Sequence, residues 1–121
     1  MIQIEVERTV AADPASVALL LAGPAAAELW PWGPTRDEPP VTFGPPTRTG
    51  VGFTVTLSAR DEALGPARGH IALTTAAGKP GATAVQLRLT TADVAGPIVR
   101  QRAARFVDEL ASLAQARSSA A

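Results

Sequence analysis

Apolar and polar residues alternate along four stretches of this sequence, at residues 2–10, 51–58, 70–74 and 85–90. Because a period of two places every second side chain on the same side of an extended chain, each stretch predicts a β-strand with one buried and one exposed face. The residues expected on the buried faces are Ile2, Ile4, Val6, Val10, Val51, Phe53, Val55, Leu57, Ile71, Leu73, Val85, Leu87 and Leu89. The connections at residues 60–69 and 76–83 are rich in turn-forming residues, which favours antiparallel hairpins.

A short helix is predicted directly after the first strand. Asp13 stands where a helix N-cap belongs, and Pro14 suits the first helical position because its missing N–H would have no partner there. The apolar run that follows ends at Gly23 and Pro24. A second short helix is expected over residues 25–29. The proline-rich segment after it, up to residue 46, is expected to be a loop with a short edge strand near residues 41–43.

Residues from about 96 to 115 predict a long amphipathic helix. Apolar residues recur there at three- and four-residue steps: Ile98, Val99, Ala103, Phe106, Val107, Leu110, Leu113 and Ala114. A helix of about 20 residues is roughly 30 Å long at ~1.5 Å per residue, which matches the reach of a nine-residue strand. One such helix can therefore cover one face of the sheet, and the final residues 117–121 are expected to fray.

Composition narrows the possible functions. The 121 residues include 11 basic and 11 acidic side chains, so the net charge of zero indicates no nucleic-acid or anionic-membrane partner. The absence of cysteine excludes disulfides, thiolate nucleophiles and cysteine metal sites. The longest apolar run, residues 17–22, is much shorter than the ~20 residues of a membrane-spanning helix. No secretory pattern follows Met1, so we expect one cytoplasmic domain over residues 1–121, without membrane insertion.

Several stretches match one family in the same order. "VERTVAADPASVALLLAG" resembles the opening strand, Ala-x-Pro turn and first helix of the SRPBCC (START/Bet v 1-like) superfamily, especially its bacterial polyketide cyclase/dehydrase and lipid-transport branch. "LWPWGP" is similar to the Trp-Pro-x-Trp-x-Pro stretch after the family's second helix, and "RTGVGFTVTL" to the Gly-x-Gly that leads into a cavity-lining strand. "GATAVQLRL" resembles its last strand and "GPIVRQRAARFVDELASLAQ" its closing helix. Family members usually have six or seven strands, whereas four clear strands and one short one are predicted here.

The resemblance implies an α+β helix-grip fold, in which an antiparallel sheet curves around a long C-terminal helix and two short helices follow the first strand. It also implies a non-catalytic binding or carrier protein for a small hydrophobic molecule, of the lipid, isoprenoid or polyketide class, in an internal cavity. No cofactor, metal or catalytic residue is expected. The cavity wall would come from Val6, Phe53, Val55, Leu57, Ile71, Leu73, Leu87, Ile98, Phe106 and Leu110.

Two other functions remain open. One is a polyketide cyclase or aromatase in which Arg8 or His70 polarises a carbonyl while the pocket positions the substrate. The other is an interaction subunit without a cavity, whose free sheet edge could form a homodimer.

Three further side chains are candidate ligand contacts. Trp30 and Trp32 either line the mouth of the cavity or fill the gap between the short helices and the sheet. By alternation, Arg8 shares the inward face of the first strand. Its guanidinium therefore needs an acidic partner or a ligand carboxylate, unless it reaches the solvent at the rim of the sheet.

His70 is the only histidine of the chain. It falls in phase with Ala72 and Thr74, opposite Ile71 and Leu73, which predicts a position on the outer face of the sheet. A single histidine without cysteine argues against a zinc site, and an imidazole without an orienting partner has no defined catalytic task. The glycine-rich stretches at residues 50–52 and 78–81 are predicted to be turns, since neither opens a helix as a phosphate-binding loop does.

Overall fold

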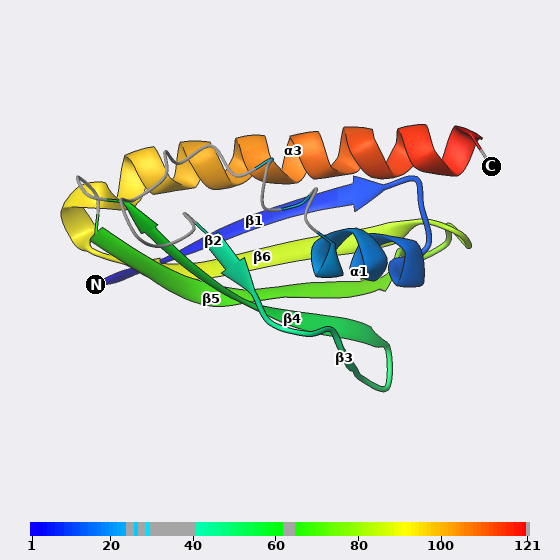
Figure 1. Ribbon diagram of the computed structural model, residues 1–121, viewed down its shortest axis with the longest axis horizontal. Coiled ribbons are helices and arrows are strands. Elements are labelled where there is room, and N and C mark those ends of the chain that lie inside the picture. The colour runs from blue at the N-terminus through cyan, green and yellow to red at the C-terminus, as the bar shows by residue number, and fades with distance from the viewer. Residues whose placement is uncertain (24–25, 27–28, 30–40, 62–64, 121) are drawn as a thin grey trace.

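The computed structural model describes residues 1–23, 26, 29, 41–61 and 65–120. Along the chain it contains β1 (Ile2–Val10), α1 (Pro14–Ala22), β2 (Val41–Phe43), β3 (Thr47–Arg48), β4 (Gly52–Asp61), β5 (Gly65–Thr75), β6 (Thr83–Thr91), a short 3-10 helix η1 (Asp93–Ala95) and α3 (Gly96–Ala120) (Figure 1). The predicted second short helix, residues 25–29, lies largely outside the described residues, as do Trp30 and Trp32.

All six strands form one antiparallel sheet in the order β1-β6-β5-β4-β2, and β3 also pairs with β4. Strand register places the predicted apolar faces on the same side: Val6 lies opposite Leu87, Leu87 opposite Ile71, and Ile71 opposite Val55. Val55, Ile71 and Leu87 are fully buried and Val6 is nearly so. The sheet thus has one continuous apolar inner face, which needs a cover.

The long helix α3 provides most of that cover. Figure 1 shows α3 running along the sheet, and it packs most extensively on β1. Phe106 and Leu110 are completely buried, and the Phe106 ring stacks on Phe43 of β2, with ring centroids 5.7 Å apart. Because β1 and β2 lie at the two ends of the strand order, α3 reaches both edges of the sheet on its inner face. The α+β helix-grip architecture predicted from the sequence is confirmed.

Helix α1 covers the inner face over β4 and β5 and also touches α3. It begins as the sequence predicts, with Asp13 at the N-cap and Pro14 in the first turn. The Asp13 backbone carbonyl accepts the first helical hydrogen bond, from the Val17 N–H at 3.2 Å. Val17, Ala18, Leu20 and Leu21 are buried whereas Leu19 is 75% exposed, so this nearly all-apolar helix still presents one side to solvent.

Strands β4 and β5 extend well into the predicted connection at residues 60–69. Ala59 pairs with Ala67 and both are buried, so the buried inner face of the sheet extends to these residues. The small residues of this segment were predicted as a turn. A Cβ on Gly69 would overlap the backbone carbonyl oxygen of Arg88, so the close approach of β5 to β6 requires glycine here. The C-terminal helix is also longer than predicted, since it continues to Ala120.

Neither α1 nor α3, the helices within the described ranges, combines the length and apolar character needed to cross a lipid bilayer.

Candidate functional site

Most of the residues predicted to line a cavity lie together in the core of the described structure. Those that are at most 5% exposed are Val6, Val55, Leu57, Ile71, Leu73, Leu87, Phe106 and Leu110. Phe53 is partly buried and packs against this cluster. Ile98 was wrongly predicted as part of the wall: it is 44% exposed, because it lies on the solvent side of the first turn of α3.

An open hollow of about 860 Å³ lies where the start of α1, the β3–β4 turn and the end of β5 meet. In Figure 1 these segments occupy the same end of the sheet. The lining residues are Asp13, Pro14, Ala15, Arg48, Thr49, Gly50, Val51, Gly52, Phe53, Thr74 and Thr75. Among the predicted ligand contacts in the described structure, Phe53 is the one that lines this hollow.

The β3–β4 turn forms one wall of the hollow. The Thr49 N–H donates to the Gly52 carbonyl at 2.8 Å, which leaves Gly50 and Val51 at the tip. A Cβ on Gly52 would overlap the Leu73 carbonyl oxygen, so glycine is needed for β4 to begin this close to β5. The next pair in the register is Arg48 with Phe53, whose side chains therefore project from the same face of the sheet.

Apolar and polar groups both line the hollow. Pro14, Ala15, Val51 and Phe53 supply apolar surface, and Val51 is 72% exposed although its place in the alternating pattern predicted burial. Strand β4 begins only at Gly52, so Val51 belongs to the turn and not to the buried face of the strand. The hollow can therefore accept an apolar group, and it can do so next to polar side chains.

The two charged residues of the hollow differ in their surroundings. Asp13 accepts a hydrogen bond from the Ser16 hydroxyl. This hydrogen bond, together with nearby backbone N–H groups at the start of α1, holds the pKa of Asp13 below its usual value despite some opposing desolvation. Arg48 has no hydrogen-bond or ion-pair partner among the side chains and backbone groups that the structure describes.

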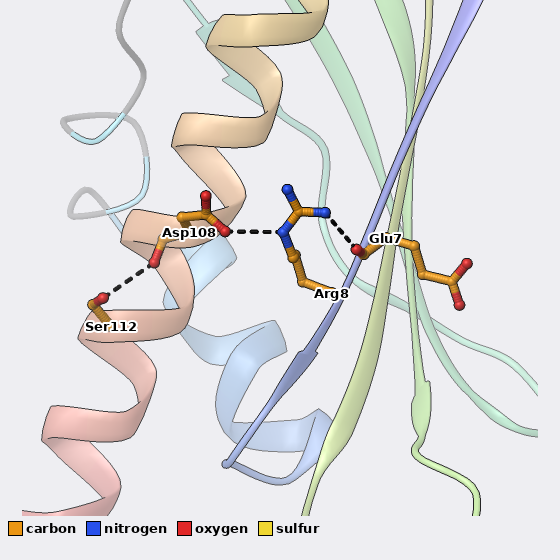
Figure 2. Close-up of polar contacts among 4 residues, drawn as sticks. All are labelled: Glu7, Arg8, Asp108 and Ser112. Carbon is orange, nitrogen blue, oxygen red and sulfur yellow. Dashed lines mark hydrogen bonds and ion pairs between the residues drawn. The ribbon is translucent and has the colours of Figure 1, made fainter.

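Arg8 lies elsewhere, between β1 and α3. Its Nε donates to Asp108 Oδ1 at 3.0 Å and its Nη1 donates to the Glu7 carbonyl at 2.7 Å (Figure 2). Strand β1 pairs with β6 without a bulge, so Arg8 keeps the inward phase that the sequence predicts, but its side chain is 44% exposed at the rim. An acidic side chain or a ligand carboxylate was expected as the partner of Arg8, and the structure contains the acidic side chain, Asp108.

His70 lies on the outer face of the sheet, as predicted, opposite Thr56 on β4 and Arg88 on β6. Arg88 Nε in turn donates to Glu5 Oε1 at 2.9 Å. Arg8 and His70 therefore belong to different faces, and neither lines the hollow. Within the described ranges, no three His, Cys, Asp or Glu side chains are grouped so that they could hold a metal ion.

The sequence analysis did not single out Arg48, Thr74 or Thr75 as functional residues. Arg48 directly precedes the Thr-Gly-x-Gly stretch, and this local signal in the sequence places it beside a turn. Its proximity to the start of α1 and to the end of β5 depends on strand pairing between distant segments. Two smaller hollows, of about 410 and 430 Å³, adjoin Arg68 and Gly69.

Comparisons with known proteins identify the fold. No family model and no curated protein matches the chain. The crystal structure of TTHA0849 from Thermus thermophilus superposes with a TM-score of 0.61 at 13% identity, covering 97% of this chain and 99% of that one. The Zhui aromatase/cyclase from Streptomyces sp. R1128 gives a TM-score of 0.35 at 16% identity, over 93% and 87% of the two chains. The protein thus shares its overall fold with TTHA0849.

Proposed function

We propose that this protein is a non-catalytic binding or carrier protein for a small hydrophobic molecule. The molecule would bind in the hollow between α1 and the β3–β4 turn. The observation that carries the proposal is the position of Phe53. Its side chain lines the hollow and also packs against the buried core cluster. An apolar guest in the hollow would therefore contact a surface that is continuous with the interior.

The size of the hollow supports this proposal. About 860 Å³ falls within the ~300–1,000 Å³ typical of small-molecule sites. Burying apolar surface on Phe53, Val51 and Pro14 would supply roughly 25 cal/mol per Å². The binding free energy would then come mainly from desolvation of the guest and of these side chains.

The placement of the candidate catalytic groups favours binding over the cyclase alternative. A cyclase needs a polarising side chain in the same space as the folded substrate. Arg8 is engaged with Asp108 at the rim, and His70 projects from the outer face. Neither side chain reaches the hollow at the end of the sheet.

Titration with N-phenyl-1-naphthylamine, a neutral apolar probe whose fluorescence rises on binding, tests the proposal. The wild-type protein should bind it saturably with one site. Gly50→Phe should weaken binding at least tenfold, because Gly50 lines the hollow and open space surrounds the position of its missing Cβ. Gln101→Phe, on the exposed side of α3, is the matched control and should bind like wild type. Absence of saturable binding, or equal binding by Gly50→Phe, would refute the proposal.

A further inference from the structure

The hollow contains a cation, Arg48, that has no hydrogen-bond or ion-pair partner among the described residues, and this feature narrows the chemical class of molecule that fits. Arg48 is a lining residue of the hollow and lies on a two-residue strand. Within the described part of the chain its guanidinium has no carboxylate within ion-pair distance. Arg8, Arg88 and Arg105, in contrast, each pair with an acidic side chain.

The other charge of the hollow does not neutralise Arg48. Asp13 occupies the N-cap position of α1 without a side-chain capping hydrogen bond, and its carboxylate accepts the Ser16 hydroxyl. A carboxylate at a helix N-terminus is stabilised by the helix dipole, so Asp13 balances α1 itself. The other lining residues with polar side chains, Thr49, Thr74 and Thr75, are neutral and add no charge to the hollow.

The apolar and cationic groups are direct neighbours. Arg48 and Phe53 are a cross-strand pair, so their side chains leave the same face of the sheet about 5 Å apart at their Cβ atoms. A molecule whose apolar body rests on Phe53 would thus bring a terminal group within reach of the guanidinium. Guanidinium groups bind carboxylates with paired N–H donors, and the bond is strengthened by charge.

We infer that the hollow selects amphipathic organic acids, with the apolar body against Phe53 and Val51 and the carboxylate at Arg48. This inference rests on the proposed function and adds the chemical class of the guest. Neutral molecules with the same apolar body would still bind, but more weakly.

Displacement of N-phenyl-1-naphthylamine by decanoate and by 1-decanol, two molecules that differ in the terminal group, tests this inference. With the wild-type protein at pH 7, decanoate should displace the probe at a concentration at least threefold lower than decanol. In Arg48→Gln this advantage should vanish, while decanol should be unaffected within twofold. Arg100→Gln removes the same charge from the exposed side of α3 and should keep the advantage of decanoate.

The outcomes separate this inference from the proposed function. If decanol and decanoate displace the probe equally, or if Arg48→Gln keeps the preference, the hollow binds apolar molecules and the assignment of acids is wrong. If Arg100→Gln loses the preference as well, the effect comes from net charge and the assignment to Arg48 is wrong. If neither compound displaces a bound probe, the hollow does not take the ten-carbon acid and this inference is wrong. If the probe itself does not bind saturably, the proposed function fails and this inference fails with it.

Discussion

Two buried threonines on β6 differ in their hydrogen bonding, and single substitutions can test this difference. Thr83 and Thr91 are both fully buried on the inner face. The Thr83 hydroxyl donates to the Ala12 carbonyl at 2.6 Å, which ties the start of β6 to the segment before α1. The Thr91 hydroxyl, in contrast, has no hydrogen-bond partner among the described residues. A buried hydroxyl without a partner costs free energy, whereas a satisfied one contributes to stability.

Replacing each threonine by valine should therefore affect the free energy of unfolding differently. Thr91→Val removes an unsatisfied hydroxyl at nearly constant shape and should leave stability unchanged or raise it by up to about 1 kcal/mol. Thr83→Val leaves the Ala12 carbonyl unpaired and should lower stability by about 1–3 kcal/mol. Urea unfolding measures both changes. A loss of stability in Thr91→Val as large as that in Thr83→Val would show that the Thr91 hydroxyl has a partner in solution.

At the scale of elements, the seam between β1 and α3 combines buried apolar contacts with a charged link. Arg8 on β1 reaches Asp108 on α3, and the Ser112 hydroxyl donates to the Asp108 carbonyl one turn further along (Figure 2). Both charged side chains are substantially exposed, at 44% and 61%. Solvent and salt therefore screen their attraction, and the pair assists a docking that is driven by apolar burial.

A double-mutant cycle with Arg8→Ala and Asp108→Ala should give a coupling free energy of about 0.2–1 kcal/mol in low salt. The coupling should decrease as the salt concentration rises. Arg105 and Glu109, which pair at 3.1 Å within α3, form a control cycle that does not involve β1. A coupling of zero in low salt would show that the Arg8–Asp108 bond is not maintained in solution.

The order of elements could be predicted from the sequence, but the ends of β4 and β5 could not. Helix α1 was predictable because Asp13 and Pro14 are local signals, and the core of α3 because its apolar period is regular. The connection predicted between β4 and β5 was too long and took in residues of both strands, since Pro66 and Gly69 resemble turn residues. Both belong to β5, where pairing with neighbouring strands outweighs local preference.

The candidate site was predictable only in part, because the hollow brings together three segments that are far apart in the chain. Phe53 was identified through its place in an alternating strand. Arg48 was not, because its position in the hollow depends on the fold of all three segments. Asp13 was predicted at the N-cap position of α1, where it lies, although its side chain makes no capping hydrogen bond. Its position at the hollow follows only from the packing of α1 against β4 and β5.

At the scale of the whole molecule, an aromatic contact joins two elements that are distant in the chain. Phe106 of α3 is completely buried and stacks on Phe43 of β2, with an angle of 20° between the ring planes. Offset-stacked rings at this separation contribute beyond the burial of their surface. The contact connects the last helix to the edge of the sheet opposite β1.

Phe106→Ala should destabilise the protein by about 3–5 kcal/mol, because it removes a large buried ring and leaves a cavity. Such a loss is a large fraction of the ~5–15 kcal/mol that stabilises a typical domain. Leu19→Ala, at a side chain that is 75% exposed, should change stability by less than about 0.5 kcal/mol. Chemical unfolding followed by circular dichroism measures both. If Phe106→Ala cost less than about 1 kcal/mol, α3 would not be docked on the sheet as described.

The position of α3 in the chain also matters while the protein is being synthesised. The six strands of the described sheet all precede Gly96, yet the helix that provides most of the cover for their inner face begins only there. A nascent chain that pauses on the ribosome before this point would expose much of the apolar inner face of the sheet to the cell. The protein should therefore be most vulnerable to aggregation, and most attractive to chaperones, during the interval before its final 25-residue helix emerges.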